Sequence, residues 1–220
     1  RGRFTCPLVI RTPYGGGIHA PEHHSDSPEA ILAHIPGIKV VIPATPNEAK
    51  GLLLSSIRDP DPVIFMEPKR IYRAIREEVP EGDYAIPLGK ARLVQEGKDV
   101  TVIAWGAMVR EVLSAAEQLK GDKIELEIID LRTISPMDTE TIIASIRKTG
   151  RGVIVHEAPK TCGLGAEIIA LINEKALLSL QAPIERVTGF DIPVPLLKTE
   201  HYYLPNPKRI VMAVKKVMSF

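Results

Sequence analysis

The second half of the chain alternates short apolar runs with amphipathic segments, and this alternation constrains the fold more than any other feature. The apolar runs are rich in Val and Ile, which favours strands, and the segments between them have apolar residues at helical spacing. Strands separated by such helices need crossover connections, so we predict a mostly parallel sheet with helices on both faces. The predicted strands are 99–106, 124–132, 152–157 and 184–191, and the predicted helices are 107–121, 138–150, 163–179 and 207–220.

The first half shows the same alternation with fewer elements. Residues 39–43 and 63–67 are predicted strands, and 47–59 between them is a predicted helix that Asn47 would cap. The apolar run Pro7–Ile10 has the character of an inner strand, so we expect the chain to begin within a domain. A polar stretch with two prolines, 73–99, separates the halves. We therefore predict an α/β protein with two units whose boundary lies inside this stretch.

Composition excludes some classes of partner. The chain has 220 residues, of which 45% are hydrophobic and 25% charged, and its 28 basic and 27 acidic residues nearly cancel. We therefore expect neither nucleic acid nor an anionic membrane as a partner. No apolar run has the length of a membrane span, and no signal peptide is recognisable. Cys6 and Cys162 form no CxxC pair, which favours a reducing cytoplasm as the location.

The segment GGGIHAPEHHSDSPEA, residues 15–30, is the densest group of chemically active side chains. His23 and His24 are adjacent and point apart on regular backbone, and no HExxH pattern occurs, so a zinc site is disfavoured. His19 and His34 are interpreted as surface residues. A loop histidine acting as a proton donor near neutral pH is the sharpest functional hypothesis, with ordinary surface histidines as the alternative.

Two glycine-containing segments and one further histidine have simple structural interpretations. Residues 15–17 follow a predicted strand but lack the spacing of a phosphate-binding loop. The segment CGLGAE, residues 162–167, precedes a helix and could hold an anion, although a tight turn with close helix packing is favoured. His156 ends a buried strand, where we expect a hydrogen-bonded core histidine.

Six segments carry a resemblance to a known family: GGGIHAPEHHSDSPEA, PGIKVVIPATPNEAKGLLLSSIRDPDPVIFMEPKRIYR, EVPEGDYAIPLGKA, DVTVIAWGAMV, IDLRTISPMD and KTGRGVIVHEAP. Together they closely resemble the β subunit of the thiamine-diphosphate-dependent E1 component of 2-oxoacid dehydrogenase complexes, of the pyruvate and branched-chain type. The resemblance covers essentially the whole chain. It implies the second half of a transketolase-type pyrimidine-binding domain over 1–80, without its N-terminal part, and a transketolase C-terminal-type domain over 81–220.

The resemblance also implies a catalytic role for one histidine. His24 matches the histidine of the family's HS(Q/D)S motif, which faces the reactive carbon of thiamine diphosphate, whereas His23 matches a variable position. Ser25, Asp26 and Ser27 would orient the imidazole and cap the following helix. The reaction is oxidative decarboxylation of a 2-oxoacid and acyl transfer to the lipoyl group of the E2 component. His24 would donate the proton that the opened lipoyl ring needs and hold the substrate oxygen.

Other parts of the implied active site lie outside this chain. In the family, the glutamate that activates the cofactor belongs to the absent N-terminal segment, and the α subunit holds the diphosphate and its magnesium. The segment as given is therefore not a complete active site.

A potassium-type cation site is implied at the turn RDPDP. The matching ligands are the Ser56 carbonyl, Asp59 and Asp61, with the Leu8 carbonyl as a further candidate. Hard cations prefer such oxygen ligands. A solvated acidic turn is the alternative.

The implied partners are an E1 α subunit and a second β subunit in an α2β2 assembly, and the E2 acyltransferase. A basic domain of E2 would dock near the carboxylate of Phe220 and an acidic position that is Gln181 here, where Glu185 could compensate. Two alternative functions remain at this stage. One is a piece of a transketolase or deoxyxylulose-phosphate synthase, and the other is a non-catalytic docking or dimerisation module. Which 2-oxoacid is the substrate does not follow from the sequence.

Overall fold

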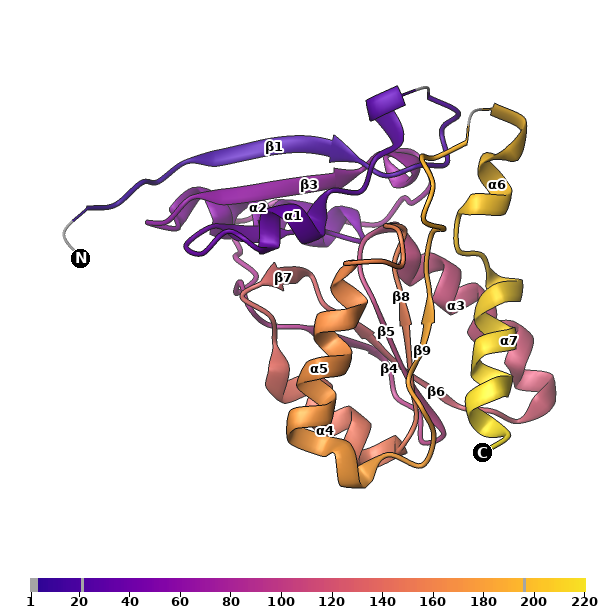
Figure 1. The fold of residues 1–220 in the computed structure, drawn as a ribbon. Helices are drawn as coiled ribbons and strands as arrows, with labels where there is room; N and C mark the ends of the chain where they lie inside the picture. Colours follow the sequence, from indigo (N-terminus) through magenta and orange to yellow (C-terminus); the bar gives the residue numbers. More distant parts are fainter. Residues whose placement is uncertain (1–3, 21, 196) are drawn as a thin grey trace.

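In a computed structural model that describes residues 4–20, 22–195 and 197–220, the chain forms two stacked α/β layers (Figure 1). The upper layer contains a sheet with the strand order β1-β3-β2-β7, in which β1, β3 and β2 are parallel and β7 is antiparallel to β2. Helices α1 (Glu29–Ala33) and α2 (Pro46–Arg58) belong to this layer. The strands are β1 (Val9–Tyr14), β2 (Lys39–Val41), β3 (Val63–Pro68) and β7 (Thr133–Ser135).

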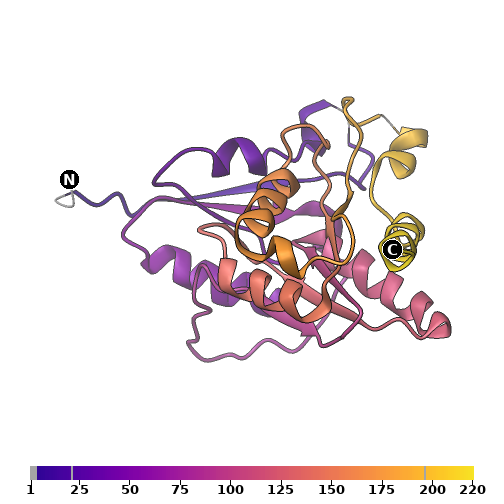
Figure 2. The same cartoon turned by 60° about the horizontal axis from the view of Figure 1, so that its bottom comes forward.

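The lower layer is built on a sheet of five strands in the order β4-β6-β5-β8-β9. Only β4 is antiparallel to its neighbour, so the predicted α/β class with mostly parallel sheets is confirmed. Figures 1 and 2 show α3 (Ala107–Leu119) and α7 (Pro207–Met218) on one face, and α4 (Thr139–Thr149) and α5 (Leu164–Ala176) on the other. The strands are β4 (Arg92–Gln95), β5 (Val100–Ala104), β6 (Leu126–Asp130), β8 (Gly152–Val155) and β9 (Glu185–Val187).

One apolar cluster extends across both layers. A cluster of buried side chains runs from Tyr14 and Ile42 in the upper layer to Trp105 and Ile168 in the lower layer. Strand β7, from the second half of the sequence, completes the first sheet by pairing with β2. Between η2 (Lys69–Ile71) and β4 there is no helix or strand, and the predicted boundary at residue 80 falls there. The boundary itself stays a prediction.

Among the described residues, strand β1 pairs only with β3, and most of its residues are exposed or half-exposed. The inner position that we expect for it in a chain beginning within a domain stays a prediction. One local prediction is wrong. The cap of α2 is Thr45, whose side chain accepts the Glu48 N–H, because the helix begins at Pro46, one residue before Asn47. Proline suits this first position since it has no N–H to satisfy.

No helix within the described part of the chain combines the length and apolar character needed to span a membrane.

Candidate functional site

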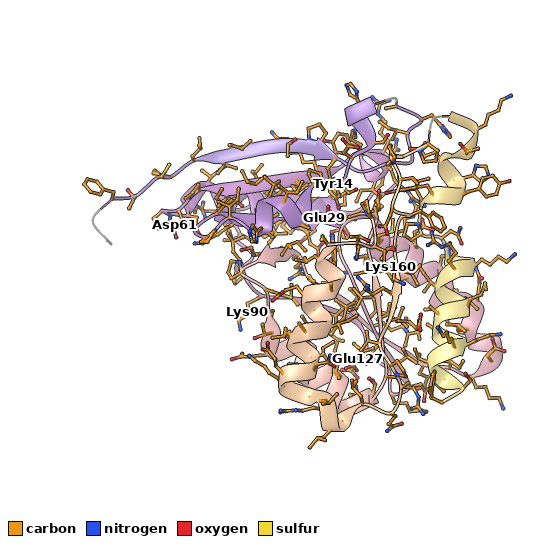
Figure 3. All side chains as sticks on the ribbon, viewed as in Figure 1. Tyr14, Glu29, Asp61, Lys90, Glu127 and Lys160 are labelled. Carbon is orange, nitrogen blue, oxygen red and sulfur yellow. The ribbon has the colours of Figure 1, made fainter. Side chains whose placement is uncertain are left out.

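The carboxyl ends of the parallel strands of both sheets meet at one junction. Tyr14 ends β1 in the upper layer, and Gly106, just after β5 in the lower layer, leaves no room for a Cβ beside the Tyr14 hydroxyl. Glu157 follows β8 toward the same place. Figure 3 shows Tyr14 and Glu29 in the upper layer, with Lys160 just across the junction. Ligand sites of open parallel sheets form at such strand ends, which makes this junction the candidate site.

Two buried carboxylates from the C-terminal part of the chain bind the backbone of the glycine run. The Gly16 N–H donates to Glu157 Oε2 at 2.9 Å, and the Gly17 N–H donates to Glu200 Oε1 at 2.5 Å. The His19 N–H donates to Glu200 Oε2 at 2.9 Å, and His19 Nδ1 lies 3.0 Å from the same oxygen. These donors are therefore used by protein carboxylates, and the phosphate-cradle interpretation of residues 15–17 does not apply here. His19, interpreted as a plain surface residue, is 62% exposed in its side chain but has this defined partner.

His24 lies on the loop that follows β1. It belongs to a short 3-10 helix, η1 (Glu22–Ser25), and its side chain is exposed, while the side chain of His23 lies outside the described part of the structure. The loop is closed by the Gly15 N–H, which donates to the Asp26 carbonyl at 2.9 Å, and by Ser25 Oγ, which donates to the Ala20 carbonyl at 2.8 Å. The imidazole is thus presented at the surface by a loop with fixed ends.

The predicted cap on the next helix is wrong. The residue that caps α1 is Pro28, and no side chain makes a capping hydrogen bond there. Ser25 is buried and bonds inside its own loop, so it supports the loop rather than the helix.

Charged groups crowd around the glycine run. Burial raises the pKa of Glu157 to about 7, although nearby Arg70 and the Gly16 N–H act in the opposite direction. Arg70 packs its aliphatic part against Gly17 and pairs with Glu111 on α3. The side chains that hold the loop therefore come from elements distant from it in the sequence.

A fully buried carboxyl group, Glu29, lies just behind this loop. Burial raises its pKa to about 8, although contacts with the Trp105 side chain and its own backbone N–H act in the opposite direction. Neither carboxyl oxygen has a hydrogen-bond partner of ordinary geometry within the described residues. A carboxyl group in such a position holds its proton at neutral pH.

His156 is a core residue, as predicted. Neither ring nitrogen has a partner of ordinary geometry in the described structure, and the ring stacks on Trp105 with centroids 5.4 Å apart. Burial and the nearby Arg186 lower its pKa to about 4, so the imidazole is neutral. A Cβ on Gly163 or Gly165 would collide with this ring, so the glycines of CGLGAE serve close packing, as favoured from the sequence.

The acidic turn after α2 already has a cationic partner. Lys39 Nζ lies 2.7 Å from both carboxylate oxygens of Asp59 and 3.2 Å from Asp61 Oδ2. The Leu8 carbonyl accepts the Val63 N–H, and the Ser56 carbonyl accepts the Asp59 N–H. The two carboxylates of the turn are therefore paired with an ammonium group in this structure. Figure 3 shows Asp61 at the far end of the layer from Tyr14 and Glu29, and no cluster of three or more metal-ligating side chains occurs in the described ranges.

The predicted docking residues lie in the lower layer. Gln181 is exposed, and its backbone N–H donates to the Gly150 carbonyl at 2.8 Å. Glu185 on β9 pairs with Lys216 at 2.6 Å, so its charge is compensated within the chain. Phe220, after the end of α7, is 67% exposed.

Two family models match the chain. Residues 1–74 match the transketolase pyrimidine-binding domain, and residues 89–210 match the transketolase C-terminal domain. Among curated relatives, the pyruvate dehydrogenase E1 component subunit β of Acholeplasma laidlawii is 55% identical over 99% of this chain and 66% of its own length. The corresponding subunit of Bacillus subtilis is 52% identical over 100% of this chain and 67% of its own length. The mitochondrial 2-oxoisovalerate dehydrogenase subunit β of Dictyostelium discoideum is 56% identical over 100% of this chain and 60% of its own length.

The chain thus spans about two thirds of the length of these relatives. Solved structures agree on the fold. A split-gene transketolase described as an inactive β4 tetramer matches with a TM-score of 0.79 and 24% identity over 100% of this chain and 70% of its own. A transketolase mutant from Pichia stipitis matches with a TM-score of 0.67 and 14% identity over 97% of this chain and 30% of its own. The chain therefore belongs to the family of 2-oxoacid dehydrogenase E1 β subunits, with pyrimidine-binding and C-terminal domains of the transketolase type.

Proposed function

We propose that this chain provides the histidine loop of a thiamine-diphosphate-dependent E1 enzyme, which oxidatively decarboxylates a 2-oxoacid and transfers the acyl group to the lipoyl group of E2. The observation that carries the proposal is the exposed imidazole of His24 on a loop anchored at Asp26 and Gly15, in a chain 52–56% identical to E1 β subunits. Identities to the transketolases are 24% and 14%, so the transketolase alternative is disfavoured.

The residues present fit one wall of the cofactor site. His24 is exposed, so a partner surface can approach it, and its loop is held by the hydrogen bonds from Gly15 to Asp26 and from Ser25 to Ala20. Thiamine diphosphate, when bound, supplies the electron sink for decarboxylation. We assign no residue of this chain to the diphosphate or to magnesium, which we propose the α subunit binds.

His24 would serve as proton donor and as hydrogen-bond donor to the substrate oxygen. Closure of the site by the α subunit would exclude water around the imidazole. The proton at its ring nitrogen would go to the lipoyl thiolate released on acyl transfer.

The test replaces His24 by Ala in a complete β subunit assembled with its α subunit. We expect binding of thiamine diphosphate to be nearly unchanged, and acyl transfer to a lipoyl domain to fall roughly a hundredfold or more. Decarboxylation with an artificial electron acceptor should fall less, because that assay bypasses opening of the lipoyl ring. His23→Ala is the matched control and should change neither assay by much. Undiminished lipoyl transfer by His24→Ala would refute the assignment.

We propose an E1 α subunit, a second β subunit and E2 as partners. An α2β2 assembly would join the β subunits through their C-terminal units, and E2 would dock at the surface that carries Gln181 and Phe220. The exposed side chains at both positions support this surface, but the pairing of Glu185 with Lys216 means that Glu185 does not replace the missing acidic residue. Light scattering of the separate chain should show at least a dimer at micromolar concentration. A clean monomer would count against the assembly.

Potassium at the RDPDP turn and a cytoplasmic location also stay predictions. Lys39 already pairs with Asp59 and Asp61, so a potassium ion at this turn would share these carboxylates with the ammonium group.

A further inference from the structure

The loop that carries His24 is bound by a carboxylate from the far end of the chain. Glu200 begins α6 (Glu200–Tyr203), a helix of four residues that lies beside the loop after β1 at one end of the molecule (Figure 1). Its side chain is 2% exposed, and it contacts Gly17 and His19 across 183 and 181 positions of sequence. A buried carboxylate is stable only where donors surround it, and here the donors belong to the loop.

The two oxygens of this carboxylate contact different groups of the loop. Oε1 accepts the Gly17 N–H, and Oε2 accepts the His19 N–H and lies 3.0 Å from His19 Nδ1. Hydrogen bonds to a charged acceptor are shorter and stronger than neutral ones. Together they fix the path of the backbone over residues 17–19, including the left-handed conformation of His19 with φ of 57°.

The contacts of Glu157 extend the same arrangement by one residue. Glu157 accepts the Gly16 N–H, so two carboxylates of the C-terminal unit bind backbone donors from residue 16 to residue 19. Nothing in the loop itself supplies these acceptors. The loop conformation therefore depends on the C-terminal unit.

We propose that Glu200 is a positioning residue for His24: its carboxylate, held by α6, fixes the segment 16–19 from which the His24 loop departs. The catalytic consequence rests on the function proposed above, whereas the structural consequence does not. Glu200 does not act on the substrate. It acts through the loop, because a displacement of about 1 Å at a proton donor lowers the rate strongly.

The sharpest variant is Glu200→Gln, which has nearly the same shape. Because both carboxylate oxygens accept backbone N–H groups, the amide NH2 of Gln must face one of those donors. That donor loses its acceptor, and the loss of a buried hydrogen bond should release the loop. Glu140→Gln on α4 is the matched control, since the Glu140 side chain is 88% exposed and makes only a long contact of 3.6 Å with Lys90.

The experiment uses a complete β subunit containing this sequence, assembled with its α subunit. Amide hydrogen exchange of peptides covering residues 15–27 is the first measurement, and we expect at least tenfold faster exchange in Glu200→Gln than in the parent or in Glu140→Gln. The second measurement compares lipoyl transfer with the artificial-acceptor assay. We expect a loss of about tenfold in the kcat of lipoyl transfer, a smaller loss with the artificial acceptor, and little change in KM.

Two further variants separate the possible outcomes. Glu200→Asp keeps both acceptor oxygens on a shorter side chain and should have an intermediate effect. It replaces Glu200→Gln in the experiment if that variant does not assemble. His24→Ala, measured in parallel, tests the proposed function alone. If His24→Ala impairs lipoyl transfer while Glu200→Gln leaves exchange and transfer unchanged, the positioning role is wrong and the proposed function stands. If exchange rises in Glu200→Gln while His24→Ala is fully active, the loop contact stands and the catalytic role of His24 is wrong.

Discussion

The ammonium group of Lys39 lies 2.7 Å from both carboxylate oxygens of Asp59, at the turn where the sequence predicts a bound cation. Lys39 begins β2 and Asp59 is the C-terminal cap of α2, so the pair links the helix to the sheet. The neighbouring carboxylates raise the pKa of Lys39, although its partial burial opposes them. The turn therefore contains its own positive charge.

Replacing Lys39 by Met should destabilise the protein by about 1 kcal/mol, because Asp59 and Asp61 would then repel each other without a counter-ion. In the parent, exchanging potassium for a bulky organic cation should leave the melting temperature unchanged. In Lys39→Met, potassium should raise the melting temperature, because the two carboxylates then lack the ammonium group. Lys90→Met is the control, since Lys90 and Glu140 are both exposed and 3.6 Å apart. A parent whose melting temperature falls on loss of potassium would support the ion site instead.

Two glycines with positive φ allow a matched test of the loop packing. Gly17 has φ of +91° and a Cβ there would lie 2.7 Å from Arg70 Cδ, whereas Gly37 has φ of +88° and nothing within 4 Å of the same position. Both Ala variants adopt the left-handed conformation at a cost of about 1 kcal/mol. Only Gly17→Ala must also displace Arg70, so its loss in thermal stability should be larger by about 1 kcal/mol or more. Equal losses would show that Arg70 moves freely.

Most elements of the fold follow from local sequence. Helices such as α3 have apolar residues at a clear period, and strands such as β5 and the three-residue β2 lie in short apolar runs, so their type could be predicted. Strands β4 and β7 have four and three residues, and α6 has four, and none of them was predicted. These three elements depend on tertiary pairing, which no short-range pattern records.

The same reasoning applies to the candidate site. His24 was identified by a family motif rather than by its periodicity or charge. Glu157 follows a predicted buried strand, which is a usable signal, because polar residues at the carboxyl ends of parallel strands gather at one edge. Glu200 carries no such signal, since its contacts with Gly17 and His19 join opposite ends of the chain.

The proposed docking surface can be tested by adding a charge. The family resemblance implies a basic E2 domain, and Gln181 is exposed, so Gln181→Glu should raise the association rate with that domain about two- to fivefold at low salt. The gain should shrink at high salt, because screening weakens exposed charges. Gln118→Glu, at an exposed position of α3, adds the same charge elsewhere and is the control. Equal rates for the two variants would place docking on another surface.

The buried carboxyl group of Glu29 should make stability fall as pH rises. Its pKa is raised to about 8 in the folded chain, from an ordinary value of 4.5, so between these values the folded state binds the extra proton. The free energy of unfolding then decreases with pH across this window, by at most about 1.4 kcal/mol per pH unit for this group. Glu157, with a pKa of about 7, adds a decrease of the same sign.

Glu29→Gln removes the titrating group and keeps the shape. Urea unfolding from about pH 5 to about pH 8 should therefore show a smaller decrease in stability in Glu29→Gln than in the parent, with the gain greatest at the alkaline end. Glu140→Gln, which removes an exposed carboxylate, should follow the parent. Because Glu157 still titrates, some decrease should remain in Glu29→Gln. If stability depends on pH with the same slope in the parent and in Glu29→Gln, Glu29 is charged in the folded protein. A partner that stabilises its carboxylate must then outweigh the effect of burial.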